Sequence, residues 1–166
     1  MFYRVRQFIN AIFPKVNASD IKWALNHLTP EAADLFLKQS WPEQRHAIDV
    51  AQNIIQARNP ISFSDFQTLI TAALLHDCGK SMVPISLWQR VYIVLMQAMP
   101  QSLWSCLEQS HTVFASPLKL ATQHALWGES LAKRAGLNSE VCLLIREHHS
   151  PQTDLGRILA QADNAN

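Results

Sequence analysis

Glycine, strand-like alternation and long apolar runs are all scarce in this 166-residue sequence. Only four residues are glycine, and segments that alternate apolar and polar residues are hard to find. The longest apolar run, Val91 to Met99, contains Gln97 and is shorter than the roughly 20 residues that a transmembrane helix needs. Helical periodicity recurs instead. We therefore expect an all-α fold without a membrane span.

Paired cysteines and an excess of one charge are also missing. The three cysteines, at 78, 106 and 142, show no C-x-x-C spacing, which indicates a reducing compartment without a disulfide framework. The net charge of +1 gives no electrostatic reason to expect nucleic acid as a partner. No signal peptide with a cleavage site is recognisable. A cytoplasmic location is the expectation.

The composition that remains, 48% hydrophobic and 16% charged, is that of one globular unit with a sizeable core. Helix starts, stops and apolar stripes predict about eight to ten helices. We expect residues 1–39 to form N-terminal helices that pack on the core. Residues 40–166 would form the main domain, with a helical insertion at about 84–115.

Two predicted helices have more than one interpretation. Residues 1–13 form a basic amphipathic pattern, which is more often packed on protein than laid on a membrane, so membrane contact is not expected. The helix at 87–99 is apolar nearly all round. It fits simple core, a cover over a site, or the interface of a homodimer.

The stretch His76-Asp77-Cys78-Gly79-Lys80 ends an apolar helix, for which Ser64 and Gln67 predict a capping box and Gly79 a terminal cap. The helix therefore delivers an imidazole and a carboxylate to the core. A buried carboxylate is costly, and a helix C-terminus already carries about −0.5 of a charge. A bound cation would remove both problems, although a hydrogen-bonded Asp-His pair would also satisfy the pattern.

Five of the seven histidines lie on or beside the apolar stripes of four helices, with two inward-leaning aspartates: His46, His76, His124, His148, His149, Asp77 and Asp163. Each histidine alone is typical of a core residue. Together they favour a metal centre in a helical bundle, and a shared aspartate would suit two metals. Gly128, one turn after His124, indicates a close approach by the site or by a neighbouring helix.

This order of residues resembles the HD-domain superfamily of metal-dependent phosphohydrolases, over roughly residues 40–163. The stretch from His76 to Lys80 stands where the HDIG and HD-GYP branches have His-Asp-Ile-Gly-Lys, with Cys78 in place of isoleucine. No Gly-Tyr-Pro follows His149, which argues against an HD-GYP enzyme for cyclic di-GMP. Glu43, three residues before His46, fits a capping box with Ser40 rather than a third metal site.

The resemblance implies an HD-domain helical bundle and a role for each site residue. The first metal would be held by His46, His76, Asp77 and Asp163. Asp77 would bridge to a second metal, held also by His124 and His148, with His149 as a further ligand. A metal-bound water or hydroxide would be the nucleophile, and Lys80 would meet the phosphate. Imidazole-rich sites favour Fe, Mn, Co, Ni or Zn over magnesium, here two ions per chain.

We therefore expect a phosphohydrolase or phosphodiesterase that acts on a nucleotide or another small phosphorylated molecule. Two alternatives stay open. A di-iron oxygenase would use the same donor atoms. A non-catalytic signalling or binding module, like the related HDOD domains, would have no need of them.

Overall fold

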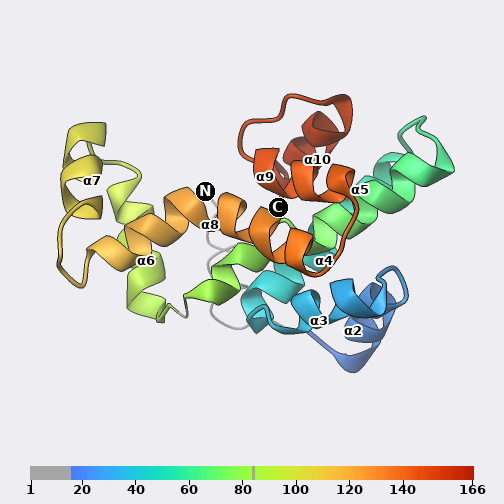
Figure 1. The fold of residues 1–166 in the computed structure, drawn as a ribbon, viewed down its shortest axis with the longest axis horizontal. Helices are drawn as coiled ribbons and strands as arrows, with labels where there is room; N and C mark the ends of the chain where they lie inside the picture. The colour runs from blue at the N-terminus through green and yellow to red at the C-terminus, as the bar shows by residue number, and fades with distance from the viewer. Residues whose placement is uncertain (1–15, 84) are drawn as a thin grey trace.

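The computed structural model describes residues 16–83 and 85–166, so the helix predicted at 1–13 lies outside the described residues. Every regular element in these ranges is helical, as expected (Figure 1). The elements are α2 (Ala18–Leu25), α3 (Pro30–Leu37), α4 (Trp41–Ala57), α5 (Phe63–Leu75), η1 (Cys78–Met82), α6 (Leu87–Met96), α7 (Gln101–Glu108), α8 (Ala115–Arg134), α9 (Ser139–Glu147) and α10 (Asp154–Asn164). No helix among the described residues has the length and apolarity that crossing a membrane requires.

One apolar core joins α2, α3, α4, α5, α9 and α10, together with the end of α8. Helix α5 lies at the centre of this core. Its fully buried residues include Leu69, Ile70, Ala72, Ala73 and Leu74. Gln39 donates from its side-chain Nε2 to the carbonyl of Leu74, at 2.9 Å, and so fixes the last turn of α5. The chain therefore enters the segment after α5 from a rigid support.

Two predicted capping boxes are wrong. Helix α5 begins two residues earlier than the Ser64 pattern predicted, because the side chain of Ser62 accepts a hydrogen bond from the amide of Asp65. Ser40 precedes α4 but forms no capping hydrogen bond, and Glu43 instead lies 2.5 Å from the guanidinium of Arg90. A charged donor binds a carboxylate more strongly than a neutral backbone amide does, which accounts for the second error.

Gly79 does not end a helix as predicted. Helix α5 stops at Leu75, and Gly79 lies within η1, while Gly136 is the glycine with a positive φ, 72°. A Cβ on Gly79 would overlap the carbonyl oxygen of His124 and lie 2.6 Å from the amide nitrogen of Gly128. The two glycines let η1 press directly against α8, so the close approach predicted at Gly128 is made by neighbouring backbone.

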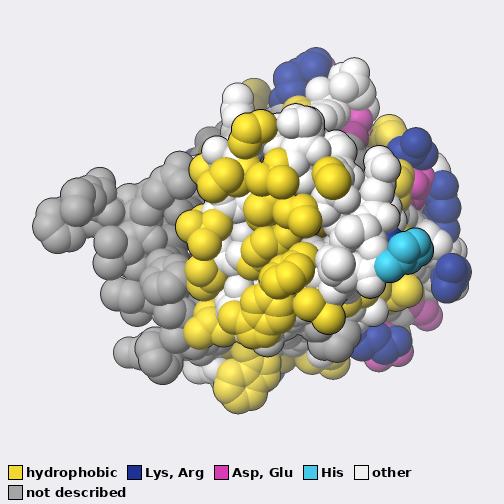
Figure 2. Space-filling model, turned by 90° about the vertical axis from the view of Figure 1, so that its left-hand side faces the viewer, with side chains coloured by type: hydrophobic (Ala, Val, Ile, Leu, Met, Phe, Trp, Pro, Cys, Tyr) yellow, Lys and Arg dark blue, Asp and Glu magenta, His cyan; other side chains and the backbone are white. Residues whose placement is uncertain are grey.

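Helices α6 and α7 form a smaller unit on the outer end of α8 (Figure 1). Met96, Trp104 and Leu118 make a second apolar cluster there. The other side of the pair stays exposed, with large apolar side chains at Leu87, Trp88, Val94, Leu95, Met99, Leu103, Val113 and Phe114. Figure 2 shows the broad apolar face on this side of the molecule. The helix that looked apolar all round is therefore buried on one side only.

Candidate metal centre

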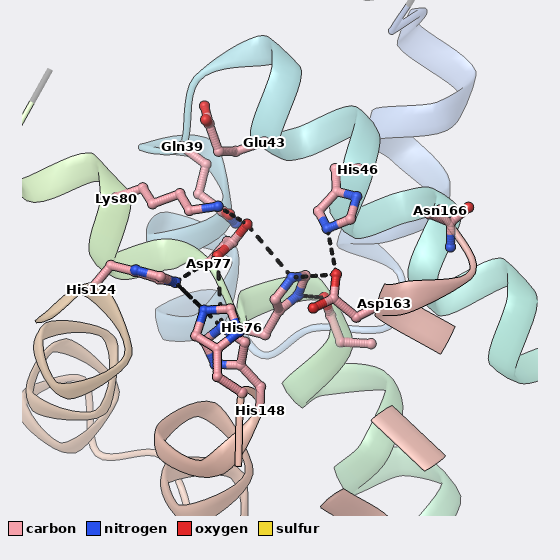
Figure 3. Close-up of polar contacts among 12 residues, drawn as sticks. Gln39, Glu43, His46, His76, Asp77, Lys80, His124, His148, Asp163 and Asn166 are labelled. Carbon is pink, nitrogen blue, oxygen red and sulfur yellow. Dashed lines mark hydrogen bonds and ion pairs between the residues drawn. The ribbon is translucent and has the colours of Figure 1, made fainter. Parts of the chain in front are cut away.

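The seven predicted site residues come together from five parts of the bundle, and Figure 3 labels all of them except His149. They are His46 from α4, His76 and Asp77 directly after α5, His124 from α8, His148 and His149 directly after α9, and Asp163 from α10. Two groups have ligand atoms within 4.8 Å of one another: His46 with His76 and Asp77, and His124 with His148 and His149. Two neighbouring ion sites are therefore geometrically available.

In the second group, His124, His148 and His149, the Nε2 atoms of the imidazoles face one another. Nδ1 of His124 lies 3.0 Å from the carbonyl of Leu120, and Nδ1 of His148 lies 2.6 Å from the carbonyl of Ile145. A carbonyl only accepts, so each Nδ1 carries the proton and each Nε2 presents a lone pair. These two Nε2 atoms are 3.3 Å apart, and Nε2 of His149 lies 2.9 Å from that of His124. A cation between them would satisfy all three nitrogens.

The first group combines two imidazoles with the carboxylate from the last helix. Nε2 of His46 lies 2.8 Å from Oδ1 of Asp163, and Nε2 of His76 lies 3.7 Å from the same oxygen. His76 is oriented like the histidines of the second group, with Nδ1 2.8 Å from the carbonyl of Ala73. Its buried Nε2 has no hydrogen-bond partner. A buried acceptor without a partner is suited to bind a metal ion.

Asp77 gives one carboxylate oxygen to each group. Oδ1 lies 3.3 Å from Nε2 of His124 and 3.9 Å from Nε2 of His148. Oδ2 lies 3.6 Å from Nε2 of His76 and 2.6 Å from the ammonium of Lys80. Oδ1 is buried without a hydrogen-bond partner. The carboxylate therefore lies between the two groups, and the donor set fits the divalent transition metals named above.

The HD domain family model matches residues 44–165, well over half of the chain. The chain belongs to the HD domain family. No curated protein and no solved structure matches it. HD domains are generally hydrolases and bind divalent metals, in agreement with the two donor groups. The HDIG subtype, the domain limits and the individual residue roles remain predictions.

The two aspartates of the candidate site, Asp77 and Asp163, stay ionised to low pH. Burial by itself would raise the pKa of Asp77, but the neighbouring histidines and above all the positive charge of Lys80 outweigh it and hold this pKa well below its ordinary value. Burial also opposes ionisation of Asp163, yet the hydrogen bond from His46 lowers the pKa of Asp163 to about 2. Both side chains are therefore anions at neutral pH, the form that binds metal.

The imidazoles divide into two electrostatic types. Burial, and next to it the neighbouring His76, lowers the pKa of His148 to about 3. Burial also lowers the pKa of His76, and the partial desolvation of His149 lowers the pKa of that residue. These three side chains are neutral at physiological pH and hold their lone pairs ready for a metal. Burial would lower the pKa of His46 as well. The hydrogen bond between His46 and Asp163 outweighs burial, so the pKa of His46 is raised.

Sequence analysis missed Glu147, whose hydrogen bonds hold together two segments that carry site residues. Its buried carboxylate accepts the amides of Gln152, at 3.1 Å, and Thr153, at 3.2 Å, and also the Thr153 hydroxyl. These bonds tie the end of α9, directly before His148, to the start of α10, which carries Asp163. The one sequence signal is the position of this acid directly before the histidine pair.

Proposed function

We propose that this HD domain is a metal-dependent phosphohydrolase that cleaves a phosphate ester in a nucleotide or another small phosphorylated molecule. The observation that carries the proposal is the split carboxylate of Asp77. One of its oxygens faces each group of imidazoles, and one oxygen and the Nε2 of His76 are buried without hydrogen-bond partners. Two adjacent divalent metals fit this arrangement.

The residues would divide the work as follows. His46, His76 and Asp163 would hold the first metal, and His124, His148 and His149 the second, with Asp77 between them. Divalent metals in such sites lower the pKa of a bound water and offset charge on a phosphoryl oxygen. The tautomers set by the carbonyls of Ala73, Leu120 and Ile145 keep the imidazoles aimed inward.

Lys80 supports phosphate as the reacting group. Its side chain is 33% exposed while that of Asp77, its partner, is 3% exposed, so a partly exposed lysine lies directly beside the buried carboxylate. An anionic substrate bound at the site would find this cation beside Asp77. Positive charge beside the bridging carboxylate stabilises a phosphoryl group that gains charge during transfer.

The test starts with metal. The number and identity of ions per chain are measured in freshly purified protein, and manganese or ferrous iron is then supplied before turnover of a panel of nucleotides and generic phosphodiesters. We expect two ions per chain, turnover by the wild type, and loss of both in a His76→Ala, Asp77→Ala double variant. His111→Ala, which changes an exposed histidine outside the site, serves as the control.

Two outcomes would replace the proposal. Bound iron with oxygen uptake, and no hydrolysis of any phosphate ester, would favour the di-iron oxygenase. Protein purified without chelator that neither contains nor takes up metal would favour a non-catalytic signalling or binding module. The homodimer and the cytoplasmic location also remain predictions, and sedimentation of the purified protein tests the first of them.

A further inference from the structure

One ion pair connects the insertion to the helix that carries His46. Nη1 of Arg90, on α6, lies 2.5 Å from Oε1 of Glu43, on the first turn of α4, and Nη2 lies 3.4 Å from the hydroxyl of Ser40. Arg90 is the only charged residue between Ile85 and Leu107. Glu43 is 6% exposed, so the pair neutralises a nearly buried carboxylate one turn from a metal-site histidine.

The same carboxylate also acts on Lys80. Burial alone would lower the pKa of Lys80, but the negative charges of Asp77, Glu43 and Asp163 together raise it. Figure 3 shows Glu43 and Lys80 on the same side of Asp77, away from His148. Glu43 is therefore a second anion within electrostatic reach of the ammonium that faces the site.

Lys80 has to change partners if Asp77 binds metal. Its ammonium lies 2.6 Å from Oδ2 of Asp77, the oxygen that also faces His76. A carboxylate oxygen that donates to a metal is a weaker partner for an ammonium. Lys80 then requires another anion, and two are available: the phosphate of a substrate or the carboxylate of Glu43.

We propose that Arg90 is a positioning residue, which keeps Lys80 available for the substrate phosphate by holding Glu43. This inference rests on the proposed function. It gives the insertion a role at the site through a single side chain. It also predicts that loss of Arg90 is harmful only while Glu43 carries its charge.

A double-mutant cycle tests the inference, with Arg90→Gln, Glu43→Gln and the combined variant, and with Arg90→Lys as the conservative control. Binding of inorganic phosphate to the manganese-loaded protein is measured by calorimetry, and manganese content is measured on the same samples. We expect Arg90→Gln to weaken phosphate binding about tenfold at unchanged manganese content. The combined variant should return to within about twofold of the wild type, because no charged Glu43 remains to attract Lys80. Arg90→Lys, which keeps the cation, should stay near the wild type.

Kinetics with a generic phosphodiester add a second readout. Because Lys80 would bind phosphate in both the ground state and the transition state, Arg90→Gln should raise KM with little change in kcat. A combined variant that binds phosphate as weakly as Arg90→Gln would overturn the inference and indicate direct contact between Arg90 and substrate. Unchanged binding in Arg90→Gln would overturn it too. If Arg90→Gln does not fold, the combined variant decides, since only near-normal phosphate binding agrees with the proposal.

Failure of the inference is distinguishable from failure of the proposed function. A wild type that binds phosphate and shows the rescue, yet turns over no phosphate ester, would contradict hydrolysis and leave the positioning role intact. Normal hydrolysis without the rescue would contradict only the positioning role. A metal-loaded wild type that binds no phosphate would contradict both.

Discussion

The bundle around the candidate metal centre and the α6–α7 unit, which was predicted as an insertion, contain the same kinds of residue in different arrangements. In the bundle, apolar side chains are buried against one another, and the buried histidines and Asp77 among them converge on one site. In the insertion, large apolar side chains such as Trp88 and Leu95 remain half or more exposed, and among residues 16–83 and 85–166 a single ion pair, at Glu43, joins it to the bundle. Substitutions should therefore be severe in the bundle and mild on the insertion, which the following four predictions test.

The largest effect is expected from Gly79→Ala. The new Cβ would overlap the carbonyl of His124 and crowd the amide of Gly128, and both of these atoms are backbone that cannot turn aside. We expect a loss of unfolding free energy of about 3 kcal/mol or more, with loss of the metal ions, because η1 must move away from α8. Urea unfolding and metal content measure the two effects.

Gly136→Ala is the matched control. It introduces strain at a φ of 72° but meets no atom within 4 Å, so it should cost only about 1 kcal/mol and leave the metal in place. Equal losses in the two variants would contradict the view that close backbone packing aligns the site.

Periodicity predicted the bundle well, because burial there follows one face of each helix. The stripes that carry His46, His124 and His148 predicted their inward direction without any long-range information. Gly79 and Glu43 were misassigned because their partners, His124 and Arg90, are tens of residues away in sequence. Such contacts compete with local capping and leave no trace at helical spacing. The exposed face of α6 was unpredictable for the same reason, since a uniformly apolar helix does not show which side is covered.

A second test of the bundle uses pH and the metal-free protein. The pKa of His148 falls from 6.5 to about 3 on folding, so the unfolded chain binds more protons between these values. The contribution of His148 to the unfolding free energy is therefore fully present above pH 6.5 and is lost as the pH falls towards 3. At pH 5 the loss should be about 2 kcal/mol. His148→Gln should flatten the pH dependence of the unfolding free energy, whereas the exposed His111→Gln should not. An identical slope in His148→Gln would contradict burial of a neutral imidazole.

A smaller effect is expected at His149, where the bundle meets solvent. Its Nε2 lies 2.9 Å from that of His124, but the residue is exposed, unlike His148. His149→Gln should weaken binding of one of the two metals about tenfold and leave the other unchanged. Titration of the metal-free protein with manganese measures both. Unaltered binding of both ions would place His149 outside the coordination shell.

The smallest effect is expected on the apolar face of the insertion. Val94 and Leu95 are 61% and 60% exposed, so they gain little from burial in the folded chain. Val94→Ser with Leu95→Ser should change the unfolding free energy by less than about 0.5 kcal/mol, when measured on dilute protein. The matched change Leu144→Ser, at a fully buried position of α9, should cost several kcal/mol. If the surface pair costs as much as Leu144→Ser, those side chains are covered in solution, and the contrast between bundle and insertion no longer holds.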